Sequence, residues 1–178
     1  AGLVNAVLRS AIRDAQQRPV LDTSEQVYGN YPGWLNDQIK AAWPAHSTAI
    51  LLASQAKPPL TLRVNRNQSS REDYLMHLQQ ADIDADPCQD SPLGVTLARP
   101  RAVGKIPGFA QATVSVQDES AQLATLMLDL APGQRVLDAC AAPGGKSLHI
   151  LEAEPHISRL QVLDLPARLP RLRENFER

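Results

Sequence analysis

Apolar side chains recur at helical spacing in the first third of the chain. In residues 1–18 the apolar side chains fall on one face of a helix, and Pro19 then breaks the pattern. This predicts an amphipathic helix, which must dock on another surface to bury its apolar stripe. Two shorter helices are predicted within residues 32–56. Trp34 and Trp43 belong to this stretch, and their helical context favours the core over a platform for stacked bases.

The pattern changes to alternation after residue 59. Residues 60–65 alternate apolar and polar side chains, which predicts a half-buried strand. Ser69 and Glu72 match a capping box at the start of a following helix. The Asp- and Pro-rich residues 82–92 are predicted to form a loop, and residues 94–98 form a second strand. Together these elements predict a small α+β unit.

The last third of the chain alternates strands and helices. Asp118 is predicted to cap a helix whose apolar stripe holds Leu123, Leu126, Met127 and Leu130. A short buried strand at 135–138, a glycine-rich turn, a helix, a strand at 160–164 and a final helix follow. This β-loop-α-β-α order is typical of the start of a Rossmann-like sheet. The fold class is therefore α/β.

Composition narrows the class of protein. The chain has 178 residues, of which 43% are hydrophobic and 21% charged, and no apolar run approaches a membrane span. The net charge of −1 weighs against nucleic acid as a partner, although a local patch can still bind RNA. Cys88 and Cys140 are far apart and lack ligand partners at metal spacing. They predict free thiols in a reducing compartment, a cytoplasmic location and no metal.

The segment from Asp138 to Lys146 has the features of a nucleotide-binding loop. It follows a strand, and Gly144 and Gly145 let the backbone approach a ligand closely. The next helix directs its free N–H groups and the positive end of its dipole at that ligand. Asp164, 19 residues after Gly145, ends the next strand, where a carboxylate can accept ribose hydroxyls.

Three kinds of nucleotide-binding motif are considered for this loop. A Walker A loop needs glycine at the position of Cys140, so that motif fails. A dinucleotide fingerprint needs three spaced glycines, whereas this loop has two adjacent ones. The loop of an S-adenosylmethionine-dependent methyltransferase tolerates variable glycine spacing and relies on the acidic residue, here Asp164.

The sequence also resembles a known family. The segment 138–147, Asp-Ala-Cys-Ala-Ala-Pro-Gly-Gly-Lys-Ser, closely resembles the cofactor motif of the Sun/Fmu family of RNA 5-methylcytosine methyltransferases. The segment 116–122 resembles the stretch that precedes this motif in the family. Supporting similarity to bacterial members that act on small-subunit ribosomal RNA extends along the chain, at residues 3–9, 32–35, 62–66 and 106–109.

The resemblance implies an architecture. Residues 1–20 would be the last helix of a NusB-like helical domain, and residues 21–115 a small RRM-like (ferredoxin-like) segment that binds RNA. Residues 116–178 would be the first part of the Rossmann-like domain that binds S-adenosylmethionine. An open half-sheet of this kind exposes apolar surface and a strand edge, so self-association is expected.

The resemblance also implies a function and a mechanism. The substrate would be a cytidine of 16S ribosomal RNA, methylated at C5 after a cysteine thiolate adds to C6. The family carries its two reactive cysteines on later strands, so the nucleophile is expected beyond residue 178 and the chain alone is expected to be inactive. A non-catalytic RNA-binding fragment and a nucleotide-dependent oxidoreductase are the alternatives.

We expect the cofactor to be bound by one loop and one acidic residue: Cys140, Ala141, Ala142, Pro143, Gly144, Gly145, Lys146 and Asp164. Cys140 is expected to pack or to line the cofactor. Asp138 is expected to hold the loop by hydrogen bonds to its backbone.

Basic side chains form two groups. The first surrounds the strand at 60–65 and either touches RNA phosphates or forms a solvated face: Lys57, Arg63, Arg66 and Arg71. The second is expected on the outer face of the last helix: Arg168, Arg171, Arg173 and Arg178.

Overall fold

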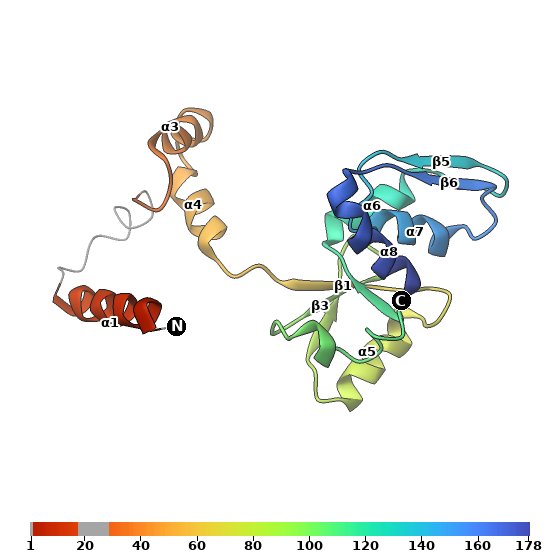
Figure 1. The fold of residues 1–178 in the computed structure, drawn as a ribbon, viewed down its shortest axis with the longest axis horizontal. Helices are drawn as coiled ribbons and strands as arrows, with labels where there is room; N and C mark the ends of the chain where they lie inside the picture. The colour runs from red at the N-terminus through yellow and green to blue at the C-terminus, as the bar shows by residue number, and fades with distance from the viewer. Residues whose placement is uncertain (1, 18–28) are drawn as a thin grey trace. The chain divides into compact units, whose positions relative to one another are not determined.

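The computed structural model describes residues 2–17 and 29–178, which belong to two compact units, residues 1–57 and 58–178. In the first unit, α1 (Gly2–Gln17) is the predicted amphipathic helix (Figure 1). Its apolar residues Val4, Val7, Leu8 and Ile12 are each more than half exposed. The predicted end of this helix at residue 18 and the domain boundary at residue 20 lie outside the described residues.

Two short helices complete the described part of the first unit. They are α3 (Gly33–Ala42) and α4 (Ser47–Gln55), as the pattern of residues 32–56 predicted. The Tyr31 hydroxyl donates to the carbonyl of Leu51 at 3.1 Å, and Leu51 is buried. The expectation that both tryptophans are core residues is wrong, because Trp34 is 64% and Trp43 56% exposed. Helices this short bury only a narrow stripe, and both indoles lie off it.

The second unit begins with a four-stranded antiparallel sheet of order β2-β3-β1-β4. Its elements are β1 (Leu60–Val64), α5 (Arg71–Gln80), β2 (Ala85–Pro87), β3 (Gly94–Leu97), the 3₁₀ turn η1 (Val103–Lys105) and β4 (Val114–Val116). The expected loop at 82–92 thus contains an edge strand. Its sequence Ala-Asp-Pro carries no strand signal, and proline is tolerated there because an edge strand leaves one side unpaired.

The helix α5 starts one residue later than the capping box predicted. The hydroxyl of Ser70, not Ser69, accepts from the N–H of Asp73 at 3.0 Å and donates to its carboxylate at 2.7 Å. The apolar face of α5 packs on the sheet through Tyr74 and Leu78, which are buried with Leu62 and Val64 of β1. The alternation predicted for β1 therefore correctly identifies its core-facing side chains.

The prediction that β1 is half-buried is wrong, because its opposite face is also covered. Thr61 and Arg63 point away from α5, and both are buried. Figure 1 shows α5 on one side of this sheet and the helices α6 (Glu119–Leu126) and α7 (Gly145–Ala153) on the other. The carbonyl of Leu62 accepts a 3.3 Å hydrogen bond from the side-chain amide of Gln122 in α6. The sheet is thus a middle layer between α5 and the rest of the unit.

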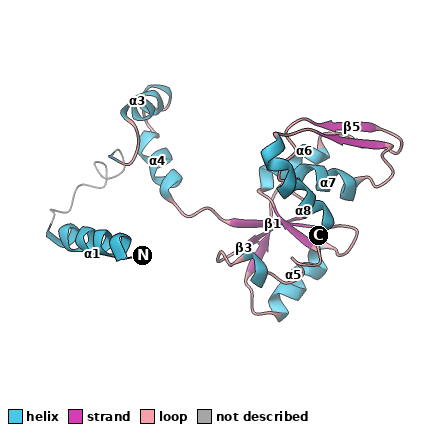
Figure 2. Ribbon diagram, in the orientation of Figure 1, coloured by secondary structure: helices cyan, strands magenta, loops and turns pink. Residues whose placement is uncertain are grey.

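The rest of the unit is the start of a Rossmann-like sheet. The strands β5 (Arg135–Asp138) and β6 (Arg159–Val162) are parallel neighbours, joined by a loop and α7 (Figure 2). The 3₁₀ turn η2 (Pro166–Arg168) and α8 (Leu169–Glu177) follow. The strand β5 was expected to be buried, but only alternate residues are covered, and Leu137 is 58% exposed.

The apolar stripe predicted for α6 is also wrong. The helix ends at Leu126, and its buried residues are Gln122 and Thr125, whereas Leu126 is 48% and Met127 79% exposed. The face toward β1 is polar because Gln122 supplies hydrogen bonds there, to the carbonyls of Leu62 and Gln117. The Asp118 cap was predicted correctly, since its carboxylate accepts from the N–H of Ser120 at 2.9 Å.

Among residues 2–17 and 29–178, no helix is long and apolar enough to span a membrane. No group of three or more potential metal ligands occurs in the same part of the chain.

Candidate cofactor-binding site

The glycine-rich loop leaves the carboxyl end of β5 and enters α7. Asp138, the last residue of β5, spans the loop with its carboxylate. One oxygen accepts from the N–H of Cys140 at 3.2 Å, and the other accepts from the hydroxyl of Ser147 at 2.6 Å. Ser147 is fully buried. The expected structural role of Asp138 is confirmed, because its carboxylate joins the two ends of the loop.

Gly144 makes the turn into α7. Its φ of +108° is in a region that residues with a Cβ rarely adopt, and it is the N-cap of the helix. A Cβ at this position would lie 3.3 Å from Cε2 of Phe176 in α8. The N–H of Leu148 bonds to the Gly144 carbonyl at 2.8 Å, which starts the helical ladder. The first N–H groups of α7 therefore lie at the loop, without partners inside the helix.

Asp164, two residues after β6, holds the other side of the loop. One carboxylate oxygen accepts from the N–H of Ala142 at 2.7 Å, and the other from the N–H of Leu165 at 2.7 Å. Arg168 lies 3.2 Å from the same carboxylate, and the side chain of Asp164 is 2% exposed. The Ala142 N–H, then Leu165 and Arg168, lower the pKa of Asp164. The carboxylate lies beside the loop, as its place at the strand end suggested.

The helix α8 covers the loop from the side. The amide of Asn175 donates to the carbonyl of Pro143 at 2.7 Å, and the guanidinium of Arg168, the last residue of η2, donates to the carbonyl of Ala142 at 2.7 Å. Leu172 packs on Ala141 and Ala142 in a small apolar cluster. The sequence assigned no role at the loop to Asn175, Leu172 or Phe176, because only the tertiary fold brings α8 to the loop.

The outer-face prediction is wrong for two arginines of this region. Arg168 bonds to the loop and to Asp164. Arg178 donates to the carbonyl of Phe109 at 2.6 Å and lies 4.0 Å from the centre of the Phe109 ring. Burial lowers the pKa of the Arg178 guanidinium. Both side chains donate to backbone carbonyls of distant segments, and a helical pattern in the sequence does not reveal such contacts.

A cavity of about 190 Å³ adjoins the loop. Six of the expected site residues line it: Cys140, Ala141, Ala142, Pro143, Gly145 and Lys146. Gly144 and Asp164 lie behind this lining, against α8 and Ala142. The far wall comes from the junction of β4 and α6, through Val116, Gln117 and Ala121. These three had no assigned role, although the similarity of residues 116–122 to a family segment pointed to the stretch.

The basic residues around β1 lie in different environments in the structure. Arg66 and Lys57 are exposed, but Arg63 is fully buried and cannot reach RNA phosphates. Arg71 donates to the carbonyls of Cys88 and Ser91 at 3.4 and 3.1 Å. Both interpretations of Arg63, phosphate contact and solvated face, are therefore wrong, because its guanidinium points into the protein.

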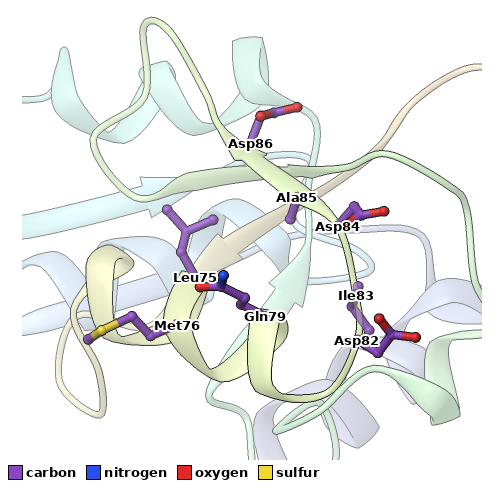
Figure 3. A pocket seen from close by; sticks show the side chains of 8 residues that line it. All are labelled: Leu75, Met76, Gln79, Asp82, Ile83, Asp84, Ala85 and Asp86. Atoms are coloured by element: carbon purple, nitrogen blue, oxygen red, sulfur yellow. The ribbon is translucent and has the colours of Figure 1, made fainter.

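A larger cavity of about 600 Å³ lies between α5 and the β2 edge. Figure 3 shows Leu75, Met76 and Gln79 of α5 on one side, and the segment from Asp82 to Asp86 on the other. Three aspartates in this segment make the rim acidic, which disfavours phosphate and nucleic acid. The glycine loop does not line it, so the smaller cavity is the candidate cofactor site.

The fold and the glycine-rich loop together define the class of protein. A ferredoxin-like sheet precedes a Rossmann-like methyltransferase segment whose glycine loop lies between the first strand and the first helix. Two family models match these parts: "Methyltr_RsmF/B-like, ferredoxin-like domain" at residues 31–104, and "16S rRNA methyltransferase RsmB/F" at residues 125–178. The chain belongs to the RsmB/F methyltransferase family.

Curated relatives agree along the whole chain. Ribosomal RNA small subunit methyltransferase B of Pseudomonas syringae is 50% identical over 99% of this chain, which covers 40% of that protein. The probable methyltransferase B of Coxiella burnetii is 42% identical over 99% of this chain, which covers 42% of it. The chain thus spans about two fifths of the length of these relatives.

Solved structures share the fold. A methyltransferase homologue from Pyrococcus horikoshii matches 89% of this chain and 53% of its own, with a TM-score of 0.75 and 22% identity. NSun6 from the same organism, solved with SFG, matches 82% of this chain and 62% of its own, with a TM-score of 0.71 and 13% identity.

Proposed function

We propose that this chain supplies the cofactor-binding part of an enzyme that transfers a methyl group from S-adenosylmethionine to C5 of a cytidine in 16S ribosomal RNA. One observation carries the proposal: the loop 138–146 joins the end of β5 to the N-terminus of α7, with Asp164 beside it, two residues after β6. Ligands of Rossmann-like sheets bind at these strand ends. The similarity to named 16S rRNA methyltransferases supports the substrate.

The residues of the loop fit the carboxylate end of such a cofactor. The first N–H groups of α7 and the positive end of its dipole favour an anion, and the exposed Lys146 adds a positive charge. Ala141 and Ala142 contribute an apolar wall. The cofactor itself supplies the activated methyl group, while the loop binds and orients it.

Asp164 fits the ribose of the same cofactor. A carboxylate accepts both ribose hydroxyls and repels a 2′-phosphate. Its oxygens bind the N–H groups of Ala142 and Leu165, and its side chain is 2% exposed. Ribose binding therefore requires the 140–143 backbone to move and uncover an oxygen. One structural neighbour was solved with SFG, an S-adenosylmethionine analogue, which supports this choice of cofactor.

We assign the catalytic thiolate to neither cysteine of the chain. Cys88 is buried, and burial is the main cause that raises its pKa, which disfavours the thiolate. Cys140 is exposed but belongs to the cofactor loop, where a packing or lining role suffices. The 178-residue chain by itself is therefore predicted not to methylate RNA.

Calorimetry with S-adenosylmethionine, S-adenosylhomocysteine and NAD tests the cofactor, using both the 178-residue chain and the full gene product that contains it. We expect the full gene product to bind the first two and not NAD. It should also transfer a labelled methyl group to 16S ribosomal RNA. Preferential binding of NAD would favour an oxidoreductase. Binding of RNA without any cofactor would leave a non-catalytic RNA-binding protein.

A further inference from the structure

Arg63 is a buried cation on the face of β1 that points away from the core of its own sheet. Its exposed fraction is 0%, and its neighbours on the strand, Leu62 and Val64, face the other way into the α5 core. The guanidinium therefore leaves the ferredoxin-like sheet and enters the Rossmann-like part. A buried arginine is stable only where its charge and N–H groups are paired.

Two hydrogen-bond partners of Arg63 lie near opposite ends of α7. Nε and Nη2 donate to the two carboxylate oxygens of Glu152 at 3.1 and 2.7 Å, a forked geometry. Nη1 donates to the carbonyl of Gly145 at 2.8 Å. Gly145 is the first residue of α7, and Glu152 lies two turns further along. One side chain thus restrains both the position and the rotation of the helix.

Arg63 also contacts the opposite wall of the candidate site. Nη1 donates to the side-chain oxygen of Gln117, at the junction of β4 and α6. Gln117 and Gly145 both line the 190 Å³ cavity, whereas Arg63 does not. The guanidinium lies behind the cavity and joins its two walls. Asn67, in the turn after β1, adds a second tie through a 3.1 Å hydrogen bond to the carbonyl of Glu152.

We propose that Arg63 is a positioning residue for the candidate cofactor site, setting the distance between the Gln117 wall and the glycine loop. The ferredoxin-like sheet then becomes a structural part of that site. The inference rests on the proposed function for the identity of the ligand, but the restraint on the loop is testable without one. Lysine cannot replace Arg63, because a single ammonium lacks the planar fork that reaches Glu152 and Gly145 together.

The test compares Arg63→Lys and Arg63→Met with Arg71→Lys and Arg71→Met in the full gene product. Arg71 is a matched control, because it belongs to the same sheet unit and donates to carbonyls at Cys88 and Ser91 without touching α7. The first readout is hydrogen–deuterium exchange of residues 139–149 without ligand. The second is the calorimetric affinity for S-adenosylmethionine. Thermal unfolding measures the stability of every variant.

We expect both Arg63 variants to exchange faster in the loop and to bind S-adenosylmethionine roughly tenfold more weakly, the effect of losing a charge-assisted hydrogen bond. The Arg71 variants should lose stability without either change. If the loop of Arg63→Lys exchanges at the wild-type rate, the proposal is overturned. If wild type shows no cofactor binding, the proposed function fails, while the exchange data still decide the role of Arg63.

Discussion

The carboxylate of Asp164 and the backbone N–H of Ala142 are joined by a 2.7 Å hydrogen bond, which links the segment after β6 to the glycine loop after β5. The bond ties an acidic residue suited to bind ribose to the loop suited to bind the rest of the cofactor. The same carboxylate is paired with Arg168, whose guanidinium also donates to the Ala142 carbonyl. The loop, the segment after β6 and η2 thus form one hydrogen-bonded unit.

This unit predicts the effect of Asp164→Asn. Asparagine keeps the size of the side chain but loses the charge that pairs with Arg168, so both the loop and the ribose contact weaken. We expect the affinity for S-adenosylmethionine to fall roughly tenfold or more, as measured by calorimetry. Asp86→Asn is the control, because Asp86 is exposed on the β2 edge, away from the loop. Wild-type affinity in Asp164→Asn would exclude a ribose role for this carboxylate.

The conformation of Gly144 predicts the effect of adding a single methyl group. Gly144→Ala forces a Cβ onto a φ of +108° and against Phe176. We expect a loss of about 1–3 kcal/mol in the free energy of unfolding, measured by urea titration. Gly104→Ala is the matched control, because a Cβ there meets nothing within 4 Å and its effect should stay within about 0.5 kcal/mol. Equal losses in the two variants would contradict the strain argument.

His149 predicts a pH dependence of stability. Its ring is 1% exposed, and neither nitrogen has a hydrogen-bond partner among the described residues. Burial, with Arg63 and Arg66 nearby, lowers its pKa from 6.5 to about 3. Between these values the unfolded chain binds a proton that the folded chain does not, so stability falls as pH falls from 6.5 toward 3, by up to about 1.4 kcal/mol per pH unit.

The measurement is the free energy of unfolding at pH 7, 6 and 5 for wild type and His149→Leu. Leucine does not titrate, so its pH slope should be shallower than that of wild type. Above pH 6.5 the ring is neutral in both states, and no dependence from this residue is expected. Parallel slopes for the two proteins would show that His149 titrates alike in folded and unfolded chains.

Exposed apolar side chains predict self-association of the 178-residue chain. Met127 is 79%, Leu137 58% and Leu165 67% exposed, all within the Rossmann-like part. Burying such side chains between copies is favourable. Sedimentation velocity should show mass increasing with concentration, and the double substitution Met127→Glu and Leu165→Glu should shift the chain toward monomer. A monomer at every concentration would contradict this prediction.

Local signals in the sequence located much of the fold. Alternation around Leu62 identified β1 and its core face, and Asp118 marked the start of α6, because side-chain periodicity and capping depend only on near neighbours. These local signals failed where contacts between distant segments decide whether a strand forms or which face is buried. The strand β2 forms because its backbone pairs with that of β3. The buried face of α6 is polar because it packs against β1, where Gln122 bonds to the backbone.

The candidate site divides in the same way. The sequence by itself determined the glycine loop, the acidic residue that follows it, and the family that carries both, since a ligand-binding backbone needs particular residues at particular spacing. Only the tertiary structure decided that Arg63 is buried and joins two layers, and that Arg168 of η2 and Asn175 of α8 hold the loop. The sequence shows that a residue is charged but does not show what will surround it in the fold. Whether it meets solvent, a phosphate or a carbonyl of a distant helix is settled when the layers pack.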